Sequence, residues 1–175
     1  MPALTTAPDF SLKGTDGKTY SLASFKDAKG LVVVFTCNHC PYARAYESRI
    51  ITLQKDFAAK GVRFVAINSN DDIGYPDDSF ENMVKRAKEK SFNFPYLRDD
   101  TQQVARAYGA THTPHLFVFG PDRRLAYTGK IDDNWENPPA VKQQYLRDAL
   151  DAIVAGKAPP KPETFAIGCT IKWRK

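Results

Sequence analysis

The feature that most constrains this 175-residue chain is an apolar run that ends at two closely spaced cysteines. Leu31–Phe35 holds three consecutive valines and no polar residue, which is typical of a strand buried on both faces of a sheet. Cys37 and Cys40 follow in a Cys-Asn-His-Cys tetrapeptide, and Pro41 comes next. Proline is favoured at the first position of a helix. The sequence therefore predicts a strand, a loop with two thiols and a helix in immediate succession.

Further apolar segments alternate with amphipathic ones, and this alternation predicts a layered α/β fold. The Asp16-Gly17 dipeptide predicts a turn in an N-terminal hairpin over residues 10–22. The remaining strands are expected at 31–35, 62–67, 94–97, 115–119 and 124–131, and the helices from 41 to the Gly61 stop signal and at 80–90, 102–108 and 140–155. Long crossovers give parallel pairs, whereas the tight turn at 120–122 makes the last two strands antiparallel. We therefore expect a central mixed sheet with helices on both faces.

The charge of the chain divides it into a nearly neutral body and a basic tail. Residues 157–175 carry five basic residues and one acid, out of a net charge of +5 for the whole chain. We assign residues 1–156 to one domain and residues 157–175 to a tail that either is solvated or packs on the body. These dispersed charges accompany no nucleic-acid-binding motif, so nucleic acid is not an expected partner.

Two observations bear on the compartment. No apolar run approaches the roughly 18 residues of a membrane span, so a membrane is not an expected partner. The first ten residues lack the basic and apolar regions of a secretory signal, and the expected location is the cytoplasm.

Together with a Thr113-Pro114 dipeptide that opens a later strand, the cysteine pair resembles the thioredoxin-like superfamily. The opening APDFSLKGTDGKTYSL and the stretch FPYLRDDTQQVARAYGATHTPHLFVFGPDRRLAYTG resemble its AhpC/TSA and TlpA/ResA-type redoxin branch, over roughly residues 7–156. The resemblance implies a thioredoxin-like fold and thiol–disulfide exchange without a cofactor. The implied partners are a protein or small-molecule disulfide and an upstream thiol reductant. It also implies that Pro114 is cis, so that Thr113 offers its backbone to a substrate strand; a trans proline that starts a strand is the alternative.

The three residues of the motif have different expected roles. A thiolate at a helix N-terminus faces unpaired N–H groups, which lower its pKa. Cys37 lies ahead of the helix, so we expect it to be the more exposed, attacking thiol and Cys40 to be the shielded, resolving thiol. Two reduced core cysteines are the alternative. His39 resembles the histidine of DsbA-type oxidants, which stabilises the thiolate and raises the reduction potential, although a solvent-facing loop histidine has the same pattern.

The loops around the cysteines follow from the topology of an open α/β sheet. Asp71 and Asp72 follow one predicted strand, and Asp132, Asp133 and Trp135 follow another that ends at the same edge. We therefore expect an acidic rim, with Trp135 as a candidate substrate-binding residue beside Thr113 and Pro114; ordinary loop composition is the alternative. The strand before the motif holds no acid, and His39 and Glu47 are the candidates for the proton acceptor of Cys40.

Two other functions compete with disulfide exchange. Peroxiredoxins place a threonine three residues before the peroxidatic cysteine, and this chain has Cys37 or Val34 there. The arginine that peroxiredoxins place before a later strand is replaced by Thr-His-Thr-Pro-His, which weakens a peroxidase function. Cys37 and Cys40 with His112 or His115 resemble in kind the copper site of Sco-type proteins. Those proteins have C-x-x-x-C instead, and we expect no metal.

Cys169, the third cysteine, lies in the tail. The expected last helix carries the chain about 24 Å from the cysteine pair at 1.5 Å per residue. Residues 157–169 span about 45 Å when extended, which is enough to return. The acidic rim attracts the basic tail, and burial of Phe165, Ile167 or Trp173 would hold it. Cys169 is thus either a third redox cysteine near Cys37 or a small buried residue elsewhere.

Overall fold

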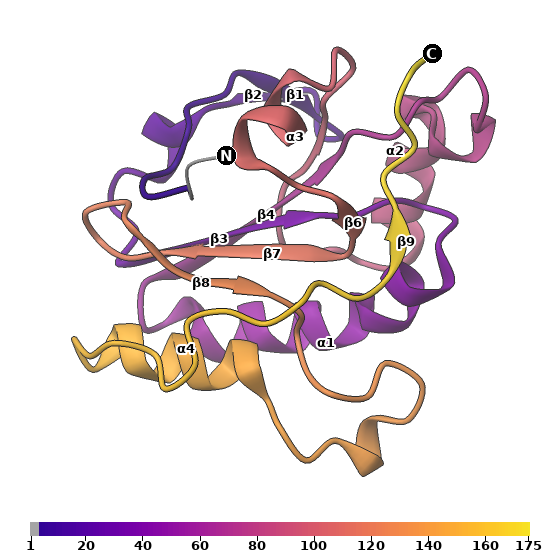
Figure 1. The fold of residues 1–175 in the computed structure, drawn as a ribbon. Helices are drawn as coiled ribbons and strands as arrows, with labels where there is room; N and C mark the ends of the chain where they lie inside the picture. Colours follow the sequence, from indigo (N-terminus) through magenta and orange to yellow (C-terminus); the bar gives the residue numbers. More distant parts are fainter. Residues whose placement is uncertain (1–3) are drawn as a thin grey trace.

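A mixed sheet of seven strands forms the centre of the computed structural model, which describes residues 4–175 (Figure 1). Its strands are β1 (Leu12–Gly14), β2 (Thr19–Tyr20), β3 (Gly30–Phe35), β4 (Val62–Asn68), β5 (Tyr96–Arg98), β7 (His115–Phe119) and β8 (Leu125–Gly129). They lie in the order β2-β1-β5-β4-β3-β7-β8. β3, β4 and β5 are parallel, whereas β7 is antiparallel to both β3 and β8. A separate pair consists of β6 (His112–Thr113) and β9 (Cys169–Thr170).

β3 is the most deeply buried strand because β4 and β7 flank it and helices cover it on both faces. All six of its residues are buried. Val32 and Val34 belong to one side of the hydrophobic core, and Leu31, Val33 and Phe35 belong to the other. The apolar run thus has the position that the sequence predicts for it.

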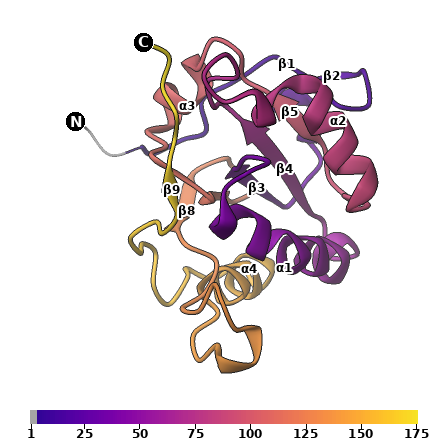
Figure 2. The same cartoon turned by 90° about the vertical axis from the view of Figure 1, so that its right-hand side faces the viewer.

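The helices cover both faces of the sheet, as expected, and Figure 2 shows α3 on the opposite side from α1 and α2. The helices are α1 (Pro41–Ala58), α2 (Phe80–Glu89), α3 (Gln103–Tyr108) and α4 (Tyr145–Val154), with short 3-10 turns at Leu22–Phe25, Pro76–Asp78 and Pro138–Ala140. α1, α2 and α4 contribute side chains to one core cluster, and α3 packs with the N-terminal segment in the other. Within residues 4–175, we find no helix that combines the length and the hydropathy of a membrane span.

The last helix is shorter than the sequence predicts. α4 begins at Tyr145, whereas the pattern predicted a helix from residue 140. Pro138–Ala140 forms a 3-10 turn, and Val141 after it is extended. The N–H of Leu146 donates to the carbonyl of Ile131, at 3.1 Å. Before the helix, the N–H of Lys142 donates to the side chain of Asp133 at 3.0 Å and the N–H of Asp133 donates to Gln143 at 3.2 Å, so this segment is tied to the loop after β8 and does not wind into a helix.

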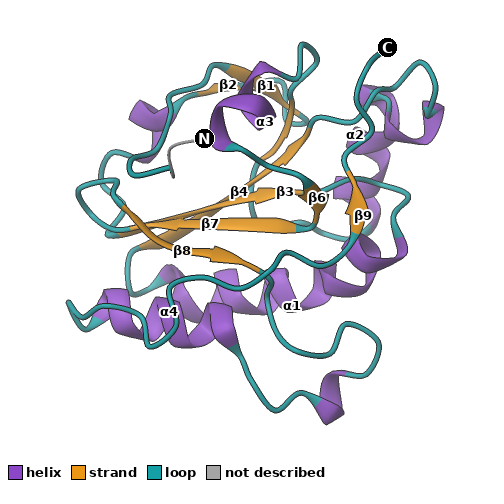
Figure 3. Ribbon diagram, viewed as in Figure 1, coloured by secondary structure: helices purple, strands orange, loops and turns teal. Residues whose placement is uncertain are grey.

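Residues 157–175, which we name the C-terminal strap, return across the end of the sheet. The strap first runs beside β8, where Thr128 donates to Pro162 (3.1 Å) and Thr164 donates to Thr128 (3.0 Å). Figures 1 and 3 show it continuing past the ends of β7 and β3 and then rising beside β6. There β9 pairs with β6 in antiparallel register. The tail therefore lies at the edge that carries the cysteine pair.

Two glycines allow the strap to approach the body this closely. Gly129 has a φ of +141°, and a Cβ at this position would lie 2.0 Å from Oγ1 of Thr164. Gly168 has a φ of +155°, and a Cβ there would lie 2.1 Å from the carbonyl oxygen of Thr113. A side chain at either position would clash, so the strap follows a path that this sequence specifically permits.

The strap is fixed to the core by a buried side chain that the sequence analysis did not single out. Ile171 is 3% exposed and packs in the core cluster of α3. Phe165, by contrast, is 94% exposed, and Ile167 and Trp173 are also exposed. Burial of Phe165, Ile167 or Trp173 was therefore the wrong expectation. Ile171 directly follows β9, and its N–H donates to the carbonyl of Thr111 at 3.0 Å, which holds this residue against the body.

The expected attraction between the basic tail and the acidic rim is partly present. The Arg174 guanidinium bonds Asp71 at 2.9 Å, Asp72 at 3.1 Å and Asp100 at 2.7 Å. Asp133 instead accepts a hydrogen bond from a backbone N–H in its own loop. Arg174 thus ties the end of the strap to acids after β4 and β5, whereas Thr164 accepts a hydrogen bond from the N–H of Lys130, directly after β8.

Candidate active site

Cys37 and Cys40 lie where β3 ends and α1 begins, and Cys40 is the N-cap residue of α1. Cys37 is 1% exposed and Cys40 is fully buried. Both thiols are thus buried, and the greater exposure that we expected for Cys37 is hardly present in this structure. Thr113 lies against both sulfurs, and Cys169 packs on the cluster that they form with Ala43.

The Thr113-Pro114 bond is cis, as the resemblance implied. Oγ1 of Thr113 lies 3.5 Å from the Cys37 sulfur, and the thiol of Cys40 lies 3.4 Å from the Thr113 carbonyl oxygen. The residue before the proline thus contacts both members of the cysteine pair. Its strand position is already filled, because Thr113 is paired in register with Cys169 of β9.

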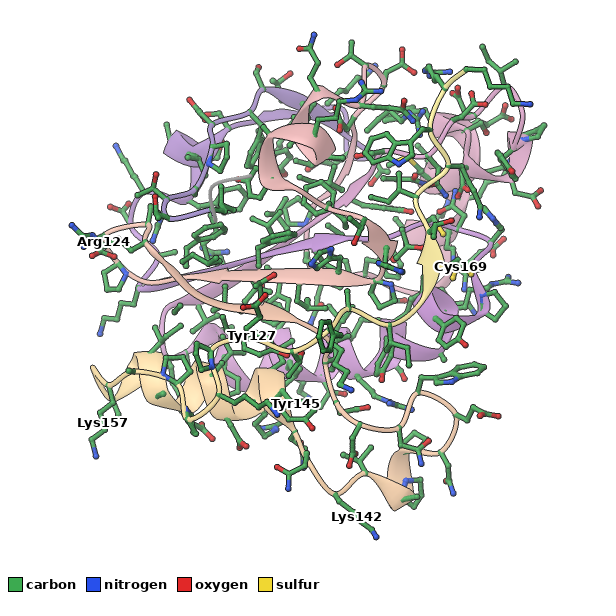
Figure 4. The ribbon with its side chains drawn as sticks, viewed as in Figure 1. Arg124, Tyr127, Lys142, Tyr145, Lys157 and Cys169 are labelled. Carbon is green, nitrogen blue, oxygen red and sulfur yellow. The ribbon has the colours of Figure 1, made fainter. Side chains whose placement is uncertain are left out.

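Cys169 is brought to the cysteine pair by the strap, which is one of the two arrangements that the sequence allowed. Figure 4 labels it on β9, at the end of the sheet where α1 begins. Its side chain is half-buried and packs against the buried cluster of Cys37 and Cys40. Of the two thiols, Cys40 is the one whose interaction with Cys169 affects the pKa of both groups. Three sulfurs therefore form one group, with Cys40 between the other two.

The pKa values of the three thiols depend on these contacts. The hydrogen bond with Cys37 lowers the pKa of Cys40 to about 4, and the thiol of Cys169 and the N–H of Ala43 act in the same direction. The same bond to Cys40 raises the pKa of Cys37, as do burial and the carboxylate of Asp78. Burial and contact with Cys40 raise the pKa of Cys169 to about 11. The lowered pKa thus belongs to Cys40 and not, as expected, to Cys37, because the interaction with the Cys37 thiol stabilises the Cys40 thiolate and the Cys169 thiol and the N–H of Ala43 add to it.

His39 is held by a buried carboxylate. Asp78 is fully buried and hydrogen-bonds Nδ1 of His39, whose side chain is 27% exposed. The His39 ring also stacks on Tyr75, with ring centroids 5.8 Å apart. Asp78 accepts further hydrogen bonds from the backbone of Asn38 and the side chains of Asn68 and Asn70. His39 is therefore a positioned group and not a free loop histidine.

Asp78 is the site residue that the sequence analysis missed. It lies in the polar loop between β4 and α2, immediately before the N-cap residue Ser79. Aspartate is common at such positions, so its type carries no signal of a functional role. Glu47, which the sequence offered as a proton acceptor, is engaged by Arg86, with N and O atoms 2.5 Å apart. Of the two candidates, His39 is the one beside the cysteines.

A metal could be considered only at one place among residues 4–175. Cys37, His39 and Asp78 form the one group of three potential ligands whose donor atoms lie within 4.8 Å of one another. The carboxylate of Asp78, however, already accepts hydrogen bonds from neighbouring amides and from His39. The group therefore serves a hydrogen-bond network, and we derive no metal chemistry from it.

The two other histidines do not join the cysteines. His112 hydrogen-bonds Thr111 beside it, at 2.8 Å. The two ring nitrogens of His115 face the N–H of Thr111 and the hydroxyl of Thr128. Burial lowers the pKa of His115 to about 4. The structure therefore does not assemble the copper site that the sequence offered as an alternative, with His112 or His115 beside Cys37 and Cys40. Neighbouring threonines engage both histidine rings.

Trp135, in the loop after β8, packs beside the start of α1, as the topology predicted. Its ring is tilted against that of Tyr42, with centroids 4.2 Å apart, and Tyr42 itself packs on the cysteine cluster. The rim acid Asp132 is bonded by Arg49 of α1 at 2.9 Å and by the hydroxyl of Tyr46 at 2.8 Å. The loop after β8 is thus fastened to α1, and its acid does not face the strap.

A buried strand that leads to two cysteines at a helix start, beside a cis-proline, defines a thioredoxin-like protein. The model of the AhpC/TSA family matches residues 4–128, and the chain belongs to that family. It is similar to the thiol-disulfide oxidoreductase ResA of Bacillus subtilis (strain 168), with 29% identity over 119 residues. That match covers 68% of this chain and 62% of the relative. The chain thus spans less than two thirds of this relative's length.

Solved structures confirm the thioredoxin-like fold. A hypothetical protein from Sinorhizobium meliloti 1021 superposes with a TM-score of 0.93 at 38% identity, covering 99% of this chain and 96% of that one. A thiol:disulfide interchange protein of the thioredoxin family from Chlorobium tepidum TLS has a TM-score of 0.61 at 26% identity, with coverages of 73% and 86%. The first similarity includes the strap, since it extends over nearly the whole chain.

Proposed function

We propose that this protein is a thiol–disulfide oxidoreductase that uses the dithiol of Cys37 and Cys40. The observation that carries the proposal is the packing of two buried thiols at the start of α1, both in contact with Thr113. The similarity to ResA supports it. The substrate is a protein or small-molecule disulfide, and an upstream thiol reductant returns the oxidised pair to the dithiol.

Cys40 is the N-cap residue of α1, where the unpaired N–H groups of the helix favour a thiolate, and its pKa is lowered, so we infer that its sulfur is the first nucleophile. The Cys40 thiolate attacks one sulfur of the substrate disulfide, the substrate S–S bond breaks, and the other substrate sulfur leaves as a thiolate. Cys37 then attacks Cys40, which forms the Cys37–Cys40 disulfide and releases the second substrate thiol. The substrate gains two electrons and two protons, and the dithiol loses them. This order is the reverse of the one that the motif alone suggests.

Cys37 must lose its proton before it can attack, and His39 is placed to accept it. Donor atoms of Cys37, His39 and Asp78 lie within 4.8 Å of one another. Asp78 bonds Nδ1 of His39 and therefore fixes the orientation of the ring. We assign His39 as the proton acceptor and Asp78 as its positioning residue.

The test is the reduction of insulin by dithiothreitol, followed by turbidity. The wild-type chain is expected to accelerate it. Cys40→Ser should lose turnover because it lacks the first nucleophile, and Cys37→Ser/Cys169→Ser should lose it because exchange needs two thiols. Cys37→Ser/Cys169→Ser keeps Cys40 as its single cysteine and should accumulate a mixed disulfide at neutral pH. The matched Cys40→Ser/Cys169→Ser variant, with Cys37 alone, should do so more slowly. Full turnover in Cys40→Ser and in Cys37→Ser/Cys169→Ser would overturn the proposal.

Peroxide consumption distinguishes the main alternative. No hydrogen bond joins an arginine to the sulfur of Cys37 or Cys40 within the described residues, whereas the peroxidases that the sequence was compared with use an arginine. Wild-type protein should therefore reduce insulin or a small disulfide faster than hydrogen peroxide at equal concentration. The opposite ranking would make peroxide the substrate.

A further inference from the structure

The strap places a cysteine where a substrate strand is expected to lie. Thr113 was expected to offer its backbone to a bound substrate, and β9 pairs with it instead. The residue of β9 that is in register with Thr113 is Cys169, whose side chain packs against the cluster of Cys37 and Cys40. β9 is thus arranged like a substrate strand that presents a sulfur to the site.

This docking is built from specific contacts on both sides of Cys169. Before it, the backbone of Gly168 passes so close to Thr113 that a Cβ would lie 2.1 Å from the Thr113 carbonyl oxygen. After it, Ile171 is buried and its N–H donates to Thr111 at 3.0 Å. Cys169 is therefore held at the cysteine pair by the path of the chain and not by a chance contact of a loose end.

We propose that Cys169 is a third redox-active cysteine, which replaces Cys37 as the disulfide partner of Cys40. The inference rests on the proposed function and adds a second route by which a mixed disulfide on Cys40 is resolved. Cys169, as its thiolate, attacks the Cys40 sulfur; the Cys40–substrate bond breaks, the Cys40–Cys169 bond forms, and the substrate sulfur leaves with the proton that Cys169 gave up. No outside oxidant or reductant is needed for this step.

The arrangement of the sulfurs selects Cys40 as the shared partner. Cys40 packs with Cys37 and Cys169 in one cluster and interacts with both of their thiols, so either of them can reach it. The oxidised chain consequently distributes between a Cys37–Cys40 and a Cys40–Cys169 disulfide, which exchange without net oxidation. The second form leaves Cys37 as a free thiol and fastens β9 covalently across the site.

The experiment uses 5,5'-dithiobis(2-nitrobenzoate) with Cys37→Ser and with Cys37→Ser/Cys169→Ser. In the single variant, attack by Cys40 releases one equivalent of thionitrobenzoate, and resolution by Cys169 releases a second. Mass spectrometry should then find a chain without adduct, and peptide mapping should find a Cys40–Cys169 link. The double variant should release one equivalent and keep the adduct.

The outcomes separate this inference from the function on which it rests. If the double variant fails to form an adduct at Cys40, the proposed order of attack is wrong. If the double variant forms the adduct and the single variant keeps its adducts without an internal link, Cys169 has no resolving role and the inference is overturned. Cys40→Ser, which retains Cys37 and Cys169, should form no internal link, and a link there would reassign the partner.

A backbone variant tests whether docking of β9 is what brings the sulfur into place. Gly168→Ala in the Cys37→Ser background should slow the second release about tenfold or more, because the new Cβ pushes β9 away from Thr113. Gly156→Ala is the matched control, since Gly156 also has a positive φ, of +72°, but nothing lies within 4 Å of its Cβ position. Equal slowing in both variants would show that docking plays no part.

Discussion

The three cysteine sulfurs belong to two segments that differ strongly in burial. Cys37 and Cys40 follow β3, in which every residue is buried and Phe35 is 1% exposed. Cys169 stands on the strap, where Ile171 is the buried hydrophobic residue and Phe165 is 94% exposed. Regions with few buried apolar contacts open at lower free energy than the core. Cys37 and Cys40 therefore lie in the rigid sheet and its helices, which we call the frame. Cys169 lies in a segment that can separate from this frame.

The largest expected effect contrasts the two supports directly. Phe35→Ala should lower the free energy of unfolding by about 3–5 kcal/mol, because it leaves a cavity in the centre of the sheet. Ile171→Ala should lower it less, since the strap can detach before the rest unfolds. Urea denaturation measures both, and hydrogen exchange should show faster exchange in the strap of the second variant. Equal losses of stability would mean that strap and body unfold as one unit.

The next effect concerns pH and belongs to the frame. The pKa of His115 falls to about 4 on folding because the ring is buried in β7, whereas the unfolded value is near 6.5. The unfolded chain then binds the extra proton first, so stability is lost as pH falls from about 6.5 to 4, by up to about 3 kcal/mol. Thermal unfolding across this range should show the loss, and His115→Gln should flatten it. Ile171→Ala should keep the same dependence; if it does not, the titrating group lies at the strap.

The smallest effect sharpens the description of the strap. Arg174 reaches three aspartates, but its side chain is 28% exposed. Exposed ion pairs contribute about 0.2–1 kcal/mol and weaken in salt. Arg174→Gln should speed hydrogen exchange in the strap a few-fold at low salt and less at high salt. A large, salt-independent effect would assign the anchoring to packing of the Arg174 stem.

The frame could be predicted because its signals are local. The valine run, the proline at the start of α1 and the Asp16-Gly17 turn each act over a few residues, and the structure contains all three elements. The start of α4 could not be read in this way. It depends on a hydrogen bond from Leu146 to Ile131, which joins two segments that only the folded chain brings together.

The parts of the site that escaped prediction are those that depend on distant contacts. Asp78 accepts hydrogen bonds from three amide groups and bonds His39. The residues next to Asp78 in the sequence do not reveal these contacts. The need for a glycine at position 168 becomes evident only in the folded chain, where the carbonyl of Thr113 lies beside it. The order of the thiol pKa values depends on interactions among the thiols and with Asp78 and Thr113, which the C-x-x-C spacing alone does not reveal.

The anchoring of Thr164 against Gly129 has a kinetic consequence. Four residues separate this anchor from Cys169, so the thiol cannot move far even when β9 leaves Thr113. A short tether holds a group at an effective concentration on the order of millimolar. A soluble thiol that attacks a mixed disulfide on Cys40 competes with this tethered one. The soluble thiol resolves the mixed disulfide faster than Cys169 only when its concentration reaches the millimolar range. The strap therefore sets the thiol concentration above which soluble thiols take over this step.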